Sequence, residues 1–436
     1  MLSYGGDFDD RATDYEFCTN GIVYGDRKIS PKAQEVKQLY APVRLFPEKD
    51  HVRIENRNNY ISTKEYAFCW KLLRDGLPVK EGVFFWDVAP LENACVKIPA
   101  LLKASEEPGE YALQVSAVLR EDKIWAERGF EISFGEYVWK KEKEQEKVME
   151  GELKIIHGDV NIGVKGKHFT AMFSKAEGGL ASLCYNGNEF ITRRPQVTYW
   201  RALTDNDRGC ALGFDCGCWQ NAGQYQKVRD IQVVEGTNEV TIVFKFTLPV
   251  PGEACSYVSY CARADGSIKV NAFFKGGKDL PDLPAFGMEW KLKKAYHHFR
   301  YYGRGPEENY VDRMEGARLG VYENTAEANV PGYLVPQECG NRTGVRWLEV
   351  TDEKGQGLRF EAEGEPFEMS VLPYSAAQLD SASHKEELPI SRHTWVRLLA
   401  KQMGVGGDDS WGAPVHKPYR IPSDTDLALV YTVKPV

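Results

Sequence analysis

Apolar and polar residues alternate with a period of two over most of the chain from about residue 41 onward. In the runs 240–248 and 267–275 every second side chain is apolar, which is typical of a strand with one buried face. Asp265-Gly266, just before the second run, indicates a tight turn. Many short runs of this kind, separated by turn residues at intervals of about 8–12 residues, indicate β-sandwiches. We therefore expect a mainly β fold.

A short helix and a first sandwich are predicted for the early part of the chain. Residues 31–40 have the pattern of a helix with Pro31 in its first turn, where the missing backbone N–H is tolerated. Residues 41–137 then alternate over a length that suits one immunoglobulin-like β-sandwich. We expect Trp70 and Trp86 in its core.

The remaining sequence divides at a run of mixed charges. Residues 140–147 carry this run, so we expect a solvated linker over 138–152. Residues 153–436 continue the strand pattern, with one helical window near 217–230, over a length that indicates two large sheets packed face to face. Residues 1–40 hold too few apolar positions for a core of their own, and we expect them to be the tail of a larger domain.

The charge balance excludes some partners. The sequence has 55 Lys+Arg and 63 Asp+Glu, a net charge of −8, so no strongly basic surface points to nucleic acid or an anionic membrane. No apolar run approaches the roughly 18 residues that a membrane-spanning helix needs. The first residues have neither the basic start nor the apolar run of a signal peptide. We expect a soluble, cytoplasmic protein.

The ten cysteines are dispersed, as expected for a reduced protein. Cys210, Cys216 and Cys218 form the one close group, and because no histidine lies near them we favour three free thiols over a zinc site. The eight histidines are scattered, and no Ser-His-Asp order or nucleophile elbow is present.

Two dense polar segments are candidates for chemistry. Residues 200–209 contain Asp205 and Asp207 with two arginines, and a polar turn with Arg–carboxylate pairs explains them without catalysis. A retaining glycosidase needs two carboxyl groups about 5–5.5 Å apart. Since nothing in a turn fixes that separation, the two residues are poor candidates for a catalytic pair. Residues 301–313 have the same character. Arg–carboxylate contacts that brace long loops are the simplest explanation, and a role at the edge of a site is the alternative.

Two further segments are typical of sugar or cation binding. Four glycines surround two aspartates and Trp411 in residues 404–412, a pattern that suits a loop presenting an indole to the apolar face of a sugar and equally a tryptophan buried in a core. Near the start, Phe17 lies three residues before Asn20 and a glycine. This is either an ordinary turn or a set of oxygen donors for a hard cation or a sugar hydroxyl.

Together these segments resemble one family, the β-galactosidases of glycoside hydrolase family 2, of the large multidomain bacterial type. The matching strings are Tyr4-Gly-Gly-Asp-Phe8, Phe17-Cys-x-Asn-Gly21, Trp200-Arg-Ala-x-Thr-Asp-Asn-Asp-Arg-Gly209, Tyr302-Gly-Arg-Gly-Pro-x-Glu-Asn-Tyr310, Pro336-Gln-Glu338 and Met403-Gly-Val-Gly-Gly-Asp-Asp-Ser-Trp411. The resemblance covers nearly the whole chain. It implies that residues 1–40 are the last loops of a catalytic (β/α)8 barrel, that 41–137 are an immunoglobulin-like fourth domain, and that 153–436 are a galactose-mutarotase-like β-supersandwich.

The resemblance implies binding roles for three residues. In the family, a sodium ion near the galactose 6-hydroxyl is held partly by a backbone carbonyl and an Asn side chain, which match Phe17 and Asn20. Both would therefore serve the metal and the substrate. A tryptophan that stacks on the sugar matches Trp411.

The resemblance also implies an active-site loop and the absence of a catalytic pair. Gly209 matches a glycine that opens a mobile loop at the active site, and Asp14 and Asp207 are placed with it. The family's two catalytic glutamates and its main magnesium ligands are implied to lie before Met1. No catalytic residue is therefore assigned here, and sodium and magnesium are expected in the intact enzyme.

The sequence departs from the family pattern at several positions. Asp9 stands where glycine is usual, Thr13 where asparagine is usual and Ala285 where arginine is usual. The loop 210–218 also differs. The resemblance implies that the change at Thr13 alters a polar contact near the family's magnesium site.

The sequence thus predicts part of a β-galactosidase that hydrolyses terminal, non-reducing β-D-galactosides of the lactose type with retention. The chain would supply sugar-binding elements, with a galactoside as substrate, a missing N-terminal catalytic portion or partner chain, and a homo-oligomer when intact. Alternatives are a non-catalytic galactoside-binding module and the small subunit of a two-chain enzyme. A mutarotase-like enzyme needs a histidine and a carboxylate in one cleft, and no histidine lies beside these strings.

Overall fold

The computed structural model describes residues 3–16, 21–98, 107–141, 151–252 and 254–436, and it shows a mainly β chain whose paired strands are antiparallel. The two alternating runs form β15 (Glu239–Thr247) and β17 (Ile268–Lys275), as the sequence predicts. The tight turn before β17 is also confirmed, because Gly266 has a φ of +89°. This left-handed conformation favours glycine.

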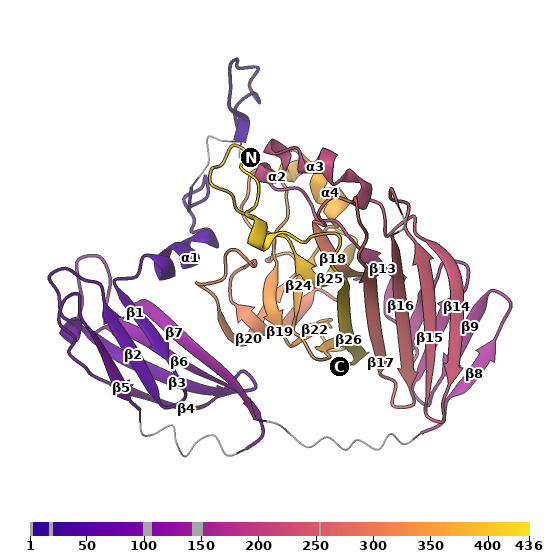
Figure 1. The fold of residues 1–436 in the computed structure, drawn as a ribbon, viewed down its shortest axis with the longest axis horizontal. Coiled ribbons are helices and arrows are strands. Elements are labelled where there is room, and N and C mark those ends of the chain that lie inside the picture. The colour runs from indigo at the N-terminus through magenta and orange to yellow at the C-terminus, as the bar shows by residue number, and fades with distance from the viewer. Residues whose placement is uncertain (1–2, 17–20, 99–106, 142–150, 253) are drawn as a thin grey trace.

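Two sheets face each other in the first part of the chain (Figure 1). The three-stranded sheet has the order β1 (Val43–Pro47), β2 (His51–Asn56), β5 (Asn93–Lys97). The four-stranded sheet has the order β4 (Leu77–Phe84), β3 (Tyr66–Arg74), β6 (Gly109–Leu119), β7 (Glu131–Lys141). Their inward side chains form one apolar core.

Trp70 lies in this core, as predicted, but the expectation for Trp86 is wrong. Trp70 on the central strand β3 is 5% exposed, whereas Trp86 is 47% exposed. Trp86 follows β4, which lies at the edge of the sheet and has mostly exposed side chains. Period-two alternation does not distinguish an edge strand from a central one, and an edge strand offers less cover to an indole.

The predicted helix forms α1 (Lys32–Leu39), with Pro31 as its N-cap residue. It joins the first sandwich to the rest of the molecule. The amide group of Gln38 donates a hydrogen bond to the Phe134 carbonyl at 2.6 Å and accepts one from the Phe134 N–H at 3.2 Å. On the other side, the Glu35 carboxylate accepts the Gly316 N–H at 2.7 Å.

Three sheets build the larger part of the chain. A five-stranded sheet has the order β12 (Asn188–Glu189), β11 (Gly179–Tyr185), β10 (Phe169–Ser174), β9 (Asn161–Lys165), β8 (Lys154–His157). A second has the order β13 (Ile191–Thr198), β18 (Ala285–Lys293), β25 (His393–Gln402), β24 (Phe367–Leu372), β21 (Arg342–Val345). A nine-stranded sheet has the order β14 (Lys227–Glu235), β15, β16 (Cys255–Arg263), β17, β26 (Leu427–Pro435), β23 (Gly357–Ala362), β22 (Trp347–Thr351), β19 (His298–Gly305), β20 (Arg318–Thr325).

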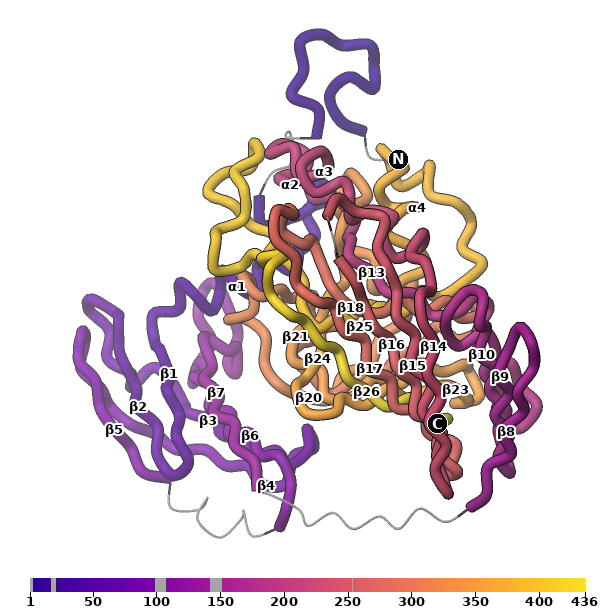
Figure 2. Tube along the Cα trace, turned by 45° about the vertical axis from the view of Figure 1, so that its right-hand side comes forward, coloured from indigo at the N-terminus to yellow at the C-terminus, as the bar shows by residue number. Residues whose placement is uncertain are grey.

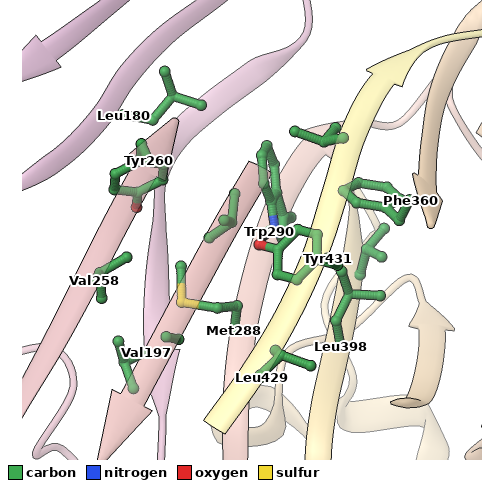
Figure 3. Close-up of a cluster of buried hydrophobic side chains, with 14 of the residues drawn as sticks. Leu180, Val197, Val258, Tyr260, Met288, Trp290, Phe360, Leu398, Leu429 and Tyr431 are labelled. Carbon is green, nitrogen blue, oxygen red and sulfur yellow. Dashed lines mark hydrogen bonds between the residues drawn. The ribbon is translucent and has the colours of Figure 1, made fainter. Parts of the chain in front are cut away.

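The nine-stranded sheet packs on the β13–β18–β25–β24–β21 sheet through one large apolar core. Figure 3 shows Trp290 of β18 beside Tyr431 of β26 and Phe360 of β23. The indole N–H of Trp290 donates a hydrogen bond to the Tyr431 hydroxyl at 2.9 Å. A buried polar atom at the centre of the core is therefore satisfied without water.

Charged residues connect the first sandwich to the large one. Glu110 on β6 accepts hydrogen bonds from Arg346 at 2.8 and 3.1 Å and from the Tyr302 hydroxyl at 2.8 Å. Burial opposes the ionisation of Glu110, but Arg346 outweighs this effect and lowers the pKa of the carboxyl group. Glu131 on β7 pairs with Arg318 in the same interface.

Two sequence expectations about elements need correction. The strand β7 continues past residue 137 to Lys141, because Lys140 and Lys141 pair across the sheet with Glu110 and Gly109. The window 217–230 contains only a 3-10 turn (Gly217–Trp219), and from Lys227 onward it is strand β14. Cross-strand pairing outweighs local helix preference there.

Three short helices lie at one end of the large sandwich (Figure 1). They are α2 (Asp205–Gly209), α3 (Leu212–Asp215) and α4 (Ala376–Asp380). Further 3-10 turns lie at Thr63–Glu65, Lys385–Glu387 and Lys417–Tyr419. In the described part of the chain, no helix is both long and apolar enough to cross a membrane.

Candidate functional site

A capping box begins the helix α2. The Thr204 side chain accepts the Asp207 N–H at 3.1 Å, and the Asp207 carboxylate accepts the Thr204 N–H at 3.0 Å. This reciprocal pair satisfies two N–H groups that a helix start leaves without partners. The polar turn predicted for residues 200–209 is thus confirmed, with its Asp side chain accepting a backbone N–H.

Asp207 also forms a buried ion pair with Arg201. The guanidinium Nε and Nη2 atoms donate to the two carboxylate oxygens at 3.1 and 2.9 Å, and the residues are 0% and 1% exposed. Burial opposes the charge of Arg201, but Asp207 outweighs it and raises the pKa of the guanidinium. Because both oxygens of Asp207 are occupied by donors, this carboxylate serves as a structural brace.

Arg201 reaches from this pair to the glycine-rich loop between β25 and β26. Its guanidinium donates to the Met403 carbonyl and, at 2.8 Å, to the Gly404 carbonyl. We call residues 404–413 the Trp411 loop. In Figures 1 and 2 this loop, in yellow, lies beside α2.

Two more side chains hold the Trp411 loop through its backbone. The Asp312 carboxylate accepts the Val405 N–H at 3.1 Å and the Gly406 N–H at 2.8 Å. The Asn206 amide donates to the Asp409 carbonyl at 2.8 Å and to the Ala413 carbonyl at 3.2 Å. The loop is therefore fastened both at its base and near its far end.

Trp411 points outward from the fastened loop. Its side chain is 72% exposed, so the interpretation of a buried core tryptophan is wrong. The Asp409 carboxylate accepts the N–H groups of Trp411 and Ala413 at 2.8 and 3.1 Å, which closes a local turn under the indole. An exposed indole on a braced loop offers a flat apolar face to a ligand.

A cavity of about 290 Å³, lined mostly by polar and charged residues, adjoins the Trp411 loop, and we call it the polar cavity. Its wall includes Val405, Gly406 and Ser410 of the loop together with Asn206 and Asp312. The volume suits a small ligand or a few side chains of another protein segment.

The cavity is also lined by an ion pair between Arg313 and Glu308. Arg313 Nη2 lies 2.8 Å from Glu308 Oε1, and the Tyr333 hydroxyl also donates to Glu308. Burial opposes the charge of Glu308, but Arg313 outweighs it and lowers the pKa of this carboxyl group. Lys32 of α1 also lines the cavity, and burial lowers the pKa of its ammonium group. This confirms the Arg–carboxylate bracing expected for residues 301–313.

Glu368 on β24 is a half-buried carboxyl group that has no ion pair with a described residue. It accepts the Asn341 amide at 2.7 Å and the Gln402 N–H at 3.2 Å. Burial raises the pKa of Glu368 to about 7, and the nearby charges of Glu338 and Asp312 act in the same direction. Glu338 itself pairs with Arg397.

The structure brings together three of the predicted site residues and separates or omits the others. Asp207, Gly209 and Trp411 meet at α2 and the Trp411 loop. Asp14 is exposed on the N-terminal loop and forms no hydrogen bond or ion pair with a described residue. Phe17 and Asn20, predicted for sodium and substrate, lie outside the described residues.

Sequence reasoning did not connect Asp312 or Arg201 with the Trp411 loop. Asp312 is 93 positions from Val405, and Arg201 is 203 positions from Gly404. The available signal was indirect: an aspartate and an arginine inside dense polar strings, next to a glycine-rich loop with many free backbone N–H and carbonyl groups.

The cysteine group forms no metal site in the described residues, where no cluster of three or more His, Cys, Asp or Glu could hold an ion. Cys210, Cys216 and Cys218 form no disulfide with a described residue. Burial raises the pKa of the Cys216 thiol to about 12, which makes it unreactive near neutral pH.

The chain matches three family models. Residues 165–433 match the beta-galactosidase small chain, residues 52–140 match beta-galactosidase domain 4, and residues 1–45 match the TIM barrel domain of glycosyl hydrolases family 2. Among solved structures, a putative aldose 1-epimerase from Escherichia coli K12 covers 65% of this chain at 9% identity, with 99% of its own length covered and a TM-score of 0.36.

Curated relatives agree with the family models. A β-galactosidase of Halalkalibacterium halodurans is 42% identical over all of this chain and 43% of its own length, and one of Lactobacillus delbrueckii subsp. bulgaricus gives the same three values. The β-galactosidase small subunit of Latilactobacillus sakei is 35% identical over 63% of this chain and 95% of its own length. The chain thus spans about two fifths of the full-length relatives. It belongs to the β-galactosidase family of glycoside hydrolases, and corresponds to the C-terminal part of the longer members.

Proposed function

We propose that this chain is the sugar-binding part of a β-galactosidase, and that the catalytic carboxylates belong to the barrel portion outside this sequence. The intact enzyme would hydrolyse terminal, non-reducing β-D-galactosides with retention, through a covalent glycosyl-enzyme. The match of residues 1–45 to the TIM barrel domain of glycosyl hydrolases family 2 supports this division.

The observation that carries the proposal is the exposed and braced Trp411. An indole that is 72% exposed does not contribute to a core, yet three polar side chains hold the backbone that bears it. Such an arrangement is useful where the ring must meet a ligand, and the apolar face of galactose suits an indole. The polar cavity beside it supplies hydrogen-bonding groups for hydroxyls or for a segment of the barrel.

The cation part of the proposal rests on donor chemistry. The backbone carbonyl of Phe17 and the side-chain oxygen of Asn20 are hard donors of the kind that hard cations prefer. They would hold part of a sodium site near the galactose 6-hydroxyl. Magnesium would be held by residues of the barrel portion, and a cytoplasmic homo-oligomer is the expected form of the intact enzyme.

A two-chain enzyme is the second candidate, and one relative favours it. The Latilactobacillus sakei small subunit is covered over 95% of its length by this chain. In that arrangement a separate large chain would carry the barrel, and the contribution of Trp411 would be the same. A mutarotase-like activity is not favoured, since no described histidine lines the polar cavity.

Saturation-transfer NMR with methyl β-D-galactoside tests the proposed role of Trp411, because it detects the weak affinity expected of an incomplete pocket. We expect transfer to the sugar ring protons in the wild-type chain and its loss in Trp411→Ala. Trp125→Ala is the matched control, since Trp125 is also largely exposed, at 65%, but lies in the first sandwich. Equal transfer in all three proteins would contradict the proposal.

A further inference from the structure

We infer that Asn206 and Asp312 are positioning residues that set the direction of the Trp411 indole. Both bind the backbone of the loop that carries the indole. The inference deepens the proposed function, and its significance for sugar binding rests on that function.

Asp312 fixes the base of the Trp411 loop. Its two carboxylate oxygens accept the N–H groups of two successive residues, Val405 and Gly406. Charge-assisted hydrogen bonds of this kind are stronger than neutral ones. The approach is so close that a Cβ atom on Gly404 would lie 2.5 Å from an oxygen of Asp312, so this side of the loop has no room for a side chain at Gly404.

Asn206 fixes the far end of the loop. Its amide group bridges the carbonyls of Asp409 and Ala413, the residues on either side of the turn that bears Trp411. A Cβ atom on Gly407 would lie 2.3 Å from the Ala413 carbonyl oxygen and 2.6 Å from the Asn206 amide nitrogen. The two sides of the loop therefore lie close together around the Asn206 amide.

These contacts add to the turn that Asp409 closes under the indole, and they restrain a segment that has little structure of its own. The Trp411 loop has no regular secondary structure and contains Gly404, Gly406, Gly407 and Gly412, which have wide conformational freedom. The exposed indole has no core packing to select one orientation. In such a segment, hydrogen bonds from rigid neighbours restrict the backbone to one conformation.

Asn206 and Asp312 come from two separate segments of the chain that both line the cavity. Asn206 belongs to α2, which the buried Arg201–Asp207 pair holds in place. Asp312 follows β19 and precedes Arg313, whose ion pair with Glu308 anchors that segment. The loop is thus hydrogen-bonded to two segments that ion pairs hold in place. Loss of the Asn206 or the Asp312 side chain should make part of the loop more mobile.

Labelling with 5-fluorotryptophan tests the inference directly, since ¹⁹F NMR reports each of the ten tryptophans. The loss of one resonance in Trp411→Phe assigns the signal of Trp411. In Asn206→Ala and in Asp312→Asn we expect that signal to shift by more than its linewidth and to narrow, as the indole gains motion. The other nine resonances should stay in place, which shows that each variant is folded.

Two matched controls isolate the effect of position. Asp352→Asn removes a carboxylate that also accepts two backbone N–H groups, those of Lys354 and Gln356, but in a distant turn. Asn188→Ala removes an exposed amide on β12. Neither control should move the Trp411 signal. An unchanged Trp411 signal in both Asn206→Ala and Asp312→Asn would overturn the inference.

The sugar experiment separates this inference from the proposed function. If the ¹⁹F signal moves in both variants, and saturation transfer to the galactoside falls as it does in Trp411→Ala, both stand. If the signal moves but transfer never depended on Trp411, the positioning role stands and the proposed function fails. We expect the first result.

Discussion

Gly209 and Gly412 are in direct backbone contact: a Cβ atom on Gly209 would lie 2.6 Å from the Cα atom of Gly412 and 2.7 Å from the Trp411 carbonyl oxygen. Gly209 ends α2, and Gly412 follows the exposed indole. Gly412 also has a φ of +114°, a conformation that side chains rarely adopt. The end of the helix and the Trp411 loop therefore pack backbone against backbone, with no room for a side chain at Gly209.

Gly209→Ala should separate the helix from the loop. The added methyl group meets backbone atoms that cannot rotate away, and overpacking of this kind costs about 1–3 kcal/mol of unfolding free energy. Urea denaturation measures the change. Gly217→Ala is the matched control, because a Cβ atom at Gly217 has no neighbour within 4 Å, and it should change stability by less than about 0.5 kcal/mol. Equal stabilities for the two variants would contradict the contact.

Asp207→Ala should be far more disruptive. It leaves the fully buried guanidinium of Arg201 without its carboxylate, which costs about 3–5 kcal/mol. For comparison, Glu323→Ala breaks a solvent-exposed pair with Arg300 at 3.3 Å, a loss of about 0–1 kcal/mol. Denaturant midpoints of the two variants give the comparison, and similar midpoints would show that the buried pair is not a brace.

The contact of His384 with the N-terminal loop should depend on pH. His384 lies 2.9 Å from Asp7 and stacks on the Tyr4 ring, and the hydrogen bond to Asp7 is the main reason that its pKa is raised above 6.5. A raised histidine pKa means that the stabilising charge is fully present below pH 6.5 and is lost as the pH rises through the folded value.

An NMR titration of the His384 ring protons, assigned with His384→Gln, measures this pKa. We expect a midpoint above 6.5 in the wild type, and a return toward 6.5 in Asp7→Asn. Asp9→Asn alters an exposed carboxylate on the same loop and should leave the midpoint unchanged. A wild-type midpoint at or below 6.5 would contradict the ion pair.

Glu368 should make the chain less stable as the pH rises. Burial raises its pKa from 4.5 to about 7, so between these values the folded state binds more protons than the unfolded state, and stability falls with increasing pH. The full loss is on the order of 3 kcal/mol above pH 7. Glu368→Gln should abolish this part of the pH dependence, whereas the exposed control Glu365→Gln should retain it. Parallel stability curves for the wild type and Glu368→Gln between pH 4.5 and 8 would contradict the shift.

The strand pattern could be predicted from the sequence because alternation is a local property. The runs that became β15 and β17, and the turn at Gly266, needed only neighbouring residues to be recognised. Exposure of Trp86 could not be predicted in the same way, since it depends on which strand lies at the edge of the sheet. The charge run also concealed the end of β7, whose lysines pair with β6.

The sequence predicted several residues of the candidate site, but it did not predict which of them lie together in the fold. The strings containing Asp207, Gly209 and Trp411 stand out locally for their glycines and charges. Their joining depends on hydrogen bonds between residues about 200 positions apart, such as Asn206 to Asp409, which is 203 positions away. Long-range contacts of this kind follow from the packing of the sheets and have no signature in a short window of sequence.

The central claim is that this chain does not catalyse hydrolysis without the barrel portion. Hydrolysis of o-nitrophenyl β-D-galactoside by the purified chain tests it, with sodium and magnesium present. The full-length Halalkalibacterium halodurans β-galactosidase serves as the active control. We expect the chain alone to release no nitrophenol above the rate in buffer, because the proposed function assigns the catalytic carboxylates to the barrel portion. Turnover that stays with the chain through a second purification step would contradict this account, since it would require a catalytic carboxylate pair within these 436 residues.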